Sequence, residues 1–237
     1  SMDYFQRNTT DLLMNVPVPA QTGFTFMLDN VGEVRNSGFE FLINSRNLTG
    51  EFQWYTSLNF TALKNEVIDL GPVDQIIRGG VQFAQNISVT MPGETLDSYY
   101  GWKILGVWQE DDDYSAAPVG VEPGDWKYAD MNNDTVITAD DRVPVGNSIP
   151  DFTWGLTNTF AYKGFDLTFY IQGVHGFDLM NNQLKDALYP INFRRNKMAE
   201  PYLNRWTPEN ETNEWASLIN PNSQGSNIVN SRTVENA

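Results

Sequence analysis

The sequence predicts an all-β fold, namely an antiparallel up-and-down meander that forms part of a large transmembrane β-barrel with long outside loops. Three observations predict it. Apolar and polar residues alternate over runs longer than the about 5–6 residues of a typical soluble strand. Aromatic residues, which favour strands, make up 13% of the chain. Short and long connections also alternate along the sequence, which a soluble sandwich has no reason to do.

The first expected elements are a strand at about 3–15 and the first arm of a hairpin. Phe39 and Phe41 alternate with polar positions there, as in a strand with one apolar face. Residues 47–50 then reverse the chain, and we expect Gly50 in a left-handed conformation at this turn.

The second arm, residues 51–64, is the clearest strand. Its apolar face carries Phe52, Trp54, Leu58, Phe60 and Ala62, with Thr56 as the only polar interruption. A tilted membrane strand needs about 9–11 residues to cross the hydrocarbon layer. This arm is therefore long enough to span a membrane.

Weaker strands are expected at about 80–90 and 97–108. The second of them carries four aromatic residues, Tyr99, Tyr100, Trp102 and Trp108. Aromatic residues near strand ends suit the girdles at a membrane interface. They suit the packed face of a soluble sheet equally well, so these residues leave both readings open.

A second strong hairpin is predicted over 151–174, with the chain turning at Lys163-Gly164. Its apolar positions are Phe152, Trp154, Leu156, Phe160 and Tyr162 on the first arm and Phe165, Leu167, Phe169 and Ile171 on the second. With this hairpin the chain holds about seven strands, which leave open edges because a barrel of this kind needs many more.

The connections fall into two sets. The short set comprises 47–50, 91–97 and 163–164, and the long set comprises 16–34, 66–79, 109–150 and 175–237. If the strands run up and down, every short turn lies at one end of the barrel and every long loop at the other. Outer-membrane barrels have short periplasmic turns and longer outside loops. We therefore interpret 109–150 and 175–237 as outside loops.

Composition and single residues exclude several functions. The formal net charge of −15 argues against nucleic acid, which needs clustered Lys and Arg, and the absence of cysteine excludes thiol chemistry. His175 is the only histidine, so a Ser/His/Asp triad would have to use it. The adjacent carboxylates Asp111, Asp112 and Asp113 have no fixed separation, as a glycosidase pair would need. We expect no enzymatic activity and no required cofactor.

Residues 130–141 lie in the acidic segment 109–150 and match much of a calcium-loop pattern. Its ligand positions are Asp130, Asn132, Asp134, the carbonyl of Val136, and Asp141. Two departures weaken the match, since Thr135 replaces the usual glycine and Asp141 replaces the longer glutamate. The pattern therefore leaves two interpretations open, a structural Ca²⁺ loop or a hydrogen-bonded acidic turn.

Aromatic residues of the expected loops form another candidate set, namely Trp126, Tyr128, Tyr189, Tyr202, Trp206 and Trp215. They could stack on sugar rings or pack the loops against one another. We favour packing, because nothing in the sequence selects which rings face a ligand.

Several motifs in this order resemble the late barrel of SusC/RagA-type TonB-dependent outer-membrane transporters. They are DLLMNVPVP at 11–19, NVGEVRNSGFE at 30–40, GDWKYAD at 124–130 followed by Asn132 and Asp134, GNSIPDFTWGL at 146–156, YKGFDL at 162–167 and RWTP at 205–208. Together they cover most of the chain.

The resemblance implies a plugged barrel of about 22 strands in the outer membrane of a Gram-negative, Bacteroidetes-type bacterium. It further implies lipid around the barrel, import of an oligosaccharide or peptide nutrient, a SusD-like surface lipoprotein as partner and energy from TonB. Residues 1–237 would be one partial barrel without the plug that contacts TonB and without the final strands. Ser1-Met2 before Asp3 resembles a cloning scar, so we expect the natural start upstream.

Two other classes compete with this interpretation. A soluble β-sandwich that binds carbohydrate would bury the apolar strand faces against a second sheet, whereas a barrel turns them toward lipid. A β-rich hydrolase would hold two loop carboxylates at a fixed separation.

Overall fold

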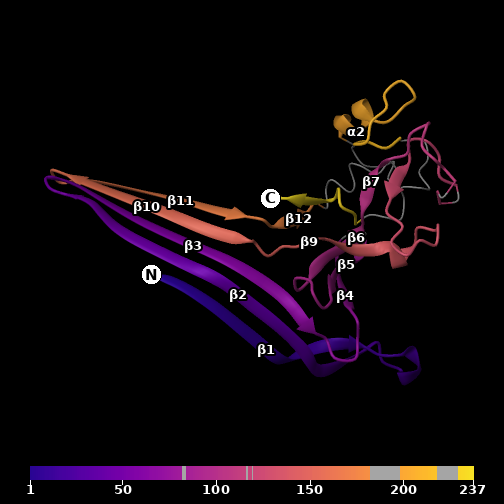
Figure 1. Cartoon of the computed structure of the whole chain (residues 1–237), viewed down its shortest axis with the longest axis horizontal. Helices are drawn as coiled ribbons and strands as arrows, with labels where there is room; N and C mark the ends of the chain where they lie inside the picture. The colour runs from indigo at the N-terminus through magenta and orange to yellow at the C-terminus, as the bar shows by residue number, and fades with distance from the viewer. Residues whose placement is uncertain (82–83, 116, 119, 182–197, 218–228) are drawn as a thin grey trace.

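The computed structural model describes residues 1–81, 84–115, 117–118, 120–181, 198–217 and 229–237. Five long antiparallel strands form one sheet in the order β1-β2-β3-β10-β11 (Figure 1). Their bounds are Met2–Pro17 for β1, Phe26–Thr49 for β2, Phe52–Asp69 for β3, Phe152–Tyr162 for β10 and Phe165–His175 for β11. We call this assembly the long sheet.

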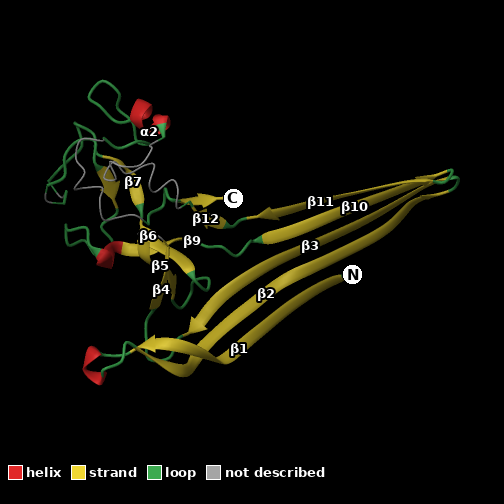
Figure 2. Cartoon of the chain, turned by 180° about the vertical axis from the view of Figure 1, so that it is seen from behind, coloured by secondary structure: helices red, strands yellow, loops and turns green. Residues whose placement is uncertain are grey.

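The remaining elements gather at one end of the long sheet (Figures 1 and 2). A four-stranded sheet has the order β4-β5-β6-β9, and the pairs β7-β8 and β12-β13 complete the strands. These strands are β4 Ile76–Val81, β5 Ala84–Thr90, β6 Ser98–Trp102, β7 Ile104–Val107, β8 Trp126–Tyr128, β9 Arg142–Gly146, β12 Asp178–Met180 and β13 Val234–Asn236. The helical turns are η1 Ala20–Thr22, η2 Ala139–Asp141 and α2 Ala199–Asn204. We call the described residues of 70–151 and 176–237 the cap.

One face of the long sheet is apolar across strands, because register pairs apolar residues with apolar residues. Phe41 lies opposite Phe60, and Leu58 lies opposite Leu156, which in turn faces Ile171. This apolar face stays exposed, with Phe165 at 81% and Leu167 at 62%. A soluble sandwich would have sealed it against a second sheet, so that alternative is wrong.

The height of the apolar face matches a bilayer. β10 runs from Phe152 to Tyr162, and ten steps of about 3.4 Å give about 34 Å along the strand. With a tilt of about 40°, that length covers about 26 Å, close to the ~25 Å apolar band of outer-membrane barrels. No helix in the described part of the chain has the length and hydrophobicity to cross a bilayer.

The tight turns lie together at the end of the long sheet opposite the cap (Figure 1). The turn at Lys163-Gly164 is confirmed, and both residues have positive φ values, 50° and 83°, as a two-residue hairpin turn needs. The turn between β2 and β3 falls at residues 50–51. Gly50 is not among the positive-φ residues, so its expected left-handed conformation was wrong.

Three expectations about the connections and weaker strands were wrong. Residues 26–34 belong to β2 and not to a long loop. The segments 80–90 and 97–108 were each expected as one strand, but the first holds the end of β4 and all of β5, and the second holds β6 and β7. These strands lie in the small cap sheets and not in the long sheet. The short connection 91–97 lies at the cap end, where Gly93 N donates to Val67 O at 2.8 Å. Tertiary pairing decided these points, because strand pattern alone does not say which sheet a strand joins.

Among the described residues, buried apolar side chains form two separate clusters. The first lies where the long sheet meets the cap and comprises Met14, Val34, Val67, Leu70 and Ile76. The second lies within the cap and comprises Val107, Trp126, Tyr128, Trp206 and Ala216. The cap is therefore a packed unit with a core of its own, held at one end of an exposed two-faced sheet.

Candidate functional site

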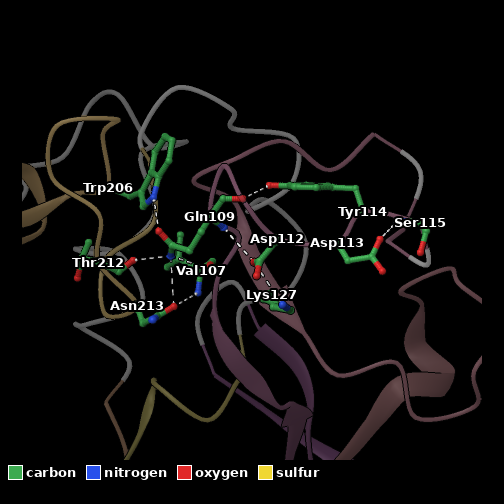
Figure 3. Close-up of polar contacts among 10 residues, drawn as sticks. All are labelled: Val107, Gln109, Asp112, Asp113, Tyr114, Ser115, Lys127, Trp206, Thr212 and Asn213. Atoms are coloured by element: carbon green, nitrogen blue, oxygen red, sulfur yellow. Dashed lines mark hydrogen bonds and ion pairs between the residues drawn. The ribbon is translucent and has the colours of Figure 1, made fainter.

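Gln109 is the hub of the hydrogen bonds that join two distant segments of the cap (Figure 3). Its Oε1 accepts from Trp206 Nε1 at 2.8 Å. Its Nε2 donates to the carbonyls of Val107 and Thr212 at 2.8 and 3.2 Å. Asn213 Oδ1 completes the set by accepting from Val107 N at 3.3 Å. We call this group the loop junction.

A charged arm extends the loop junction toward β8. Asp112 accepts from Gln109 N at 3.0 Å and forms an ion pair with Lys127 at 3.3 Å. The Lys127 ammonium also lies 4.2 Å from the ring centroid of Trp108, a cation–π distance. Tyr114 packs on Trp108 at 5.0 Å and donates its hydroxyl to Gln109 O at 2.7 Å. The arm thus fixes the first turns of the acidic loop.

These contacts shift two pKa values in the loop junction. The Gln109 amide, and then the neighbouring Lys127, lower the pKa of Asp112 because both favour the carboxylate. Burial, and then the nearby charge of Asp112, raise the pKa of Tyr114 because both disfavour the phenolate. At neutral pH the acid is charged and the phenol is neutral, which is the pairing that the hydrogen bonds need.

The loop aromatic residues mostly pack the cap. Trp126, Tyr128 and Trp206 are 4%, 9% and 5% exposed, which confirms packing for these three. Tyr202 on α2 is 58% exposed, with the Arg205 guanidinium 4.5 Å from its ring. Trp215 is half-buried, and Tyr189 lies outside the described residues. Only Tyr202 presents most of its ring to solvent among those the structure describes.

The predicted calcium positions form a tight turn. Asp130 accepts from the amides of Asp134 and Thr135 at 3.3 and 2.8 Å. Asp134 accepts from the amide of Val136 at 2.8 Å. Asp141, 0% exposed, accepts from the amides of Met131 and Thr138 at 2.9 and 2.7 Å and so closes the loop.

These hydrogen bonds fit a self-sufficient acidic turn. Asn132 Oδ1 accepts from the amide of Asp134 at 3.0 Å, so a fourth predicted ligand also has a partner. Within the described residues, no group of three or more His, Cys, Asp or Glu side chains is placed to hold a metal ion. The side chains that the pattern names do come together, but backbone amides occupy several of their oxygens.

Acidification is expected to loosen the loop junction through Asp112. Because the pKa of Asp112 is lowered in the folded cap, its full contribution to cap stability is present at neutral pH. That contribution is lost as the pH falls below the ordinary pKa of 3.8 and through the lowered pKa. Asp112→Asn is expected to raise amide exchange of the junction about twofold to fivefold at pH 7, with a smaller difference from the native receptor in acid. Asp111→Asn is the control, since Asp111 is exposed. Equal exchange in both variants would contradict the role of Asp112.

Sequence reasoning missed Gln109 and the loop junction. Gln109 directly follows an aromatic residue in a loop, and no spacing rule marks such a glutamine as a hub. Its partners at 206–213 lie about a hundred residues away in sequence and are brought near only by the cap fold. His175, the sole histidine, lies at the end of β11 with its ring 4.8 Å from Phe152.

No protein-family profile matches the chain. TonB-dependent receptor P26 of Formosa agariphila is 36% identical over 218 residues, covering 90% of this chain and 22% of that protein. TonB-dependent receptor SusC of Bacteroides thetaiotaomicron is 26% identical over 215 residues, covering 84% and 20%. The chain thus spans about a fifth of the length of the curated relatives it matches.

Solved structures show the same fold. A structure of the RagAB peptide transporter superposes with a TM-score of 0.72 at 20% identity, covering 99% of this chain and 24% of that chain. The RagAB peptide importer in its open-open state gives the same TM-score and coverage. The long sheet is thus a stretch of a large transmembrane barrel, as the sequence predicted. The relatives are receptors and not enzymes, and the chain belongs to the SusC/RagA-type TonB-dependent receptors of the Gram-negative outer membrane.

Proposed function

We propose that the chain is the part of an outer-membrane transporter that supplies consecutive barrel strands and the folded outside cap for import of an oligosaccharide or peptide. The observation that carries this proposal is the combination of an exposed apolar sheet face with a packed cap at one end only. Lipid suits the apolar face, and the cap suits the side where nutrient arrives. RagAB, a peptide transporter with the same fold, favours a peptide among the two nutrient classes.

The proposed partners follow from the two ends of the long sheet. The cap end, with the exposed Tyr202 and Leu203 of α2, would meet a SusD-like surface lipoprotein. The tight-turn end would face the periplasm, where TonB supplies energy to the whole receptor. The edge strands β1 and β11 would pair with further strands of the same barrel, because free edges otherwise attract other chains.

The experiment is an uptake assay in cells that carry the full-length receptor. Fluorescent oligosaccharides and peptides of graded length are supplied to cells with the receptor, without it, and with TonB depleted. We expect accumulation of one of the two classes that depends on both proteins. Accumulation of both classes at the same level in receptor-deficient cells would overturn the proposal.

We also propose that residues 130–141 bind a structural Ca²⁺ that stiffens the cap. The predicted ligands are Asp130, Asn132, Asp134, Asp141 and the carbonyl of Val136. Hard oxygen donors suit Ca²⁺, and the ion would add to the hydrogen bonds that already close the turn.

Calcium is expected to raise the unfolding temperature of the receptor, since a ligand at about 100 times its Kd stabilises the folded state by ~2.7 kcal/mol. Asp134→Asn should abolish the shift in unfolding temperature, because it removes the negative charge that would bind the ion. The turn itself should persist, since the amide Oδ1 can still accept from Val136 N. Asp140→Asn removes the same charge from an exposed side chain outside the ligand positions and should retain the shift. Equal shifts in the two variants, or none in the native receptor, would leave only the acidic turn.

A further inference from the structure

The neighbouring strands β3 and β10 are joined by no turn. β3 ends at Asp69 and β10 begins at Phe152, with the cap residues 70–151 between them. A hairpin fixes its register through its turn, as Lys163-Gly164 does for β10 and β11. No tight turn fixes the β3–β10 register, so contacts between side chains of the two strands bear on it directly.

Alternation alone sets this register incompletely. A slip by one residue turns apolar side chains to the wrong face and is excluded. A slip by two residues keeps every side chain on its face, and both strands carry large apolar residues at successive outward positions. Discrimination against the two-residue slip needs an interaction that only one pairing can form.

A polar group in the apolar face forms such an interaction. Asn158 Oδ1 accepts from Trp54 Nε1 at 2.8 Å and from Thr56 Oγ1 at 2.7 Å. Thr56 lies directly opposite Asn158 in the observed register. Because the Trp54 indole can only donate, it fixes which atom of the Asn158 amide faces it.

The group extends to β2 at the bulge. Asn47 Nδ2 donates to Thr56 Oγ1 at 2.7 Å, and Ser45 Oγ donates to Asn47 Oδ1 at 2.7 Å. The register between β2 and β3 shifts between Arg46 and Leu48, so the bulged position is the one that joins the group. One continuous set of hydrogen bonds thus ties three strands.

The depth of the group makes it selective. Asn158 lies near the middle of β10 and is only 7% exposed. Phe160 stacks on Trp54 at 5.7 Å and on Phe169 at 5.8 Å beside it. In hydrocarbon, no water can replace a lost partner. A two-residue slip would place Thr56 opposite Leu156 or Phe160 and separate its hydroxyl from the Asn158 amide.

We propose that Asn158, with Trp54 and Thr56, is a register lock that selects the pairing of β3 and β10 during barrel assembly. The test uses cysteine pairs on the opposite, polar face of the full-length receptor in a cysteine-free background. Ser57→Cys with Thr157→Cys reports the native register, because these residues are direct partners. Ser57→Cys with Thr159→Cys reports a two-residue slip, since diagonal neighbours lie about 7–8 Å apart in the native pairing.

In the native background we expect disulfide formation by the first pair only. Asn158→Leu should lower native cross-linking by about threefold or more and raise the slipped cross-link. If Asn158→Leu yields no assembled receptor, the milder change Thr56→Val is tested with the same two cysteine pairs. The exchanged pair Thr56→Asn with Asn158→Thr should restore the native cross-link. Thr168→Val is the control in the Ser57–Thr157 reporter, which keeps Thr159, because it removes the Thr159–Thr168 hydroxyl contact across a hairpin whose turn fixes the register. Unchanged cross-linking ratios in the Asn158 and Thr56 variants would overturn the proposal.

Discussion

Trp206→Ala is expected to open the cap while the long sheet stays folded. Trp206 is 5% exposed and packs with Val107, Trp126 and Ala216. Its loss removes a large buried ring at a cost of about 3–5 kcal/mol and also leaves Gln109 Oε1 without its indole donor. The rate of backbone amide hydrogen exchange at 107–128 and 206–217 should therefore rise by about a hundredfold or more. The amides of β10 and β11 should stay protected from exchange.

The matched control is Tyr202→Ala, four residues earlier on α2. Tyr202 is 58% exposed, so its removal should change cap exchange by less than about threefold. If Trp206→Ala left amide exchange in the cap as slow as Tyr202→Ala does, the second apolar cluster would not be the core of the cap. If it also released β10, cap and sheet would form one cooperative unit.

Gly124→Ala is expected to damage the same junction by a different route. Gly124 has φ +91°, and a Cβ there would lie 2.5 Å from Trp206 Cε3 and 2.7 Å from Ser217 Cβ. Its amide donates to Trp108 O and its carbonyl accepts from Ser217 N, both at 2.7 Å. The backbone cannot move away without breaking the bridge between the two loop segments.

Gly120→Ala separates the clash from the backbone strain. Gly120 has φ +85° with nothing within 4 Å of a built Cβ, so both variants carry the strain of a left-handed alanine, about 1–2 kcal/mol. Overpacking should add about 1–3 kcal/mol at Gly124 only. Rates of limited proteolysis within the cap would measure the difference, and equal rates for the two variants would show that the junction accommodates the methyl group.

Local rules predicted the membrane strands well. The alternation in 51–64 and 151–174 was correct, because a strand's side-chain period of two needs no knowledge of its partners. The turn at Lys163-Gly164 was correct for the same reason, since two residues with positive φ suffice to close a hairpin. Gly50 shows the limit of that reasoning, because a glycine in a turn does not have to adopt the left-handed conformation that it permits.

The candidate site was less predictable. The acidic residues 130–141 form the compact turn that their spacing indicated, because its hydrogen bonds are local. The loop junction joins Gln109 to residues about a hundred positions away, and no local pattern encodes such a contact. For the same reason the burial of Trp126 and Trp206 followed only from the packing of two loops on each other.

The sequence by itself determined the two-faced strands, the tight turns at 163–164 and the assignment to a membrane barrel, because strand periodicity and turn conformation are properties of neighbouring residues. Only the tertiary structure decided that β3 pairs with β10 across the cap, that β4 to β7 lie in separate small sheets, and that Trp126, Tyr128 and Trp206 pack inward. Those outcomes depend on contacts between residues far apart in the chain. The free energies of such contacts depend on the whole fold and produce no periodic pattern in the sequence.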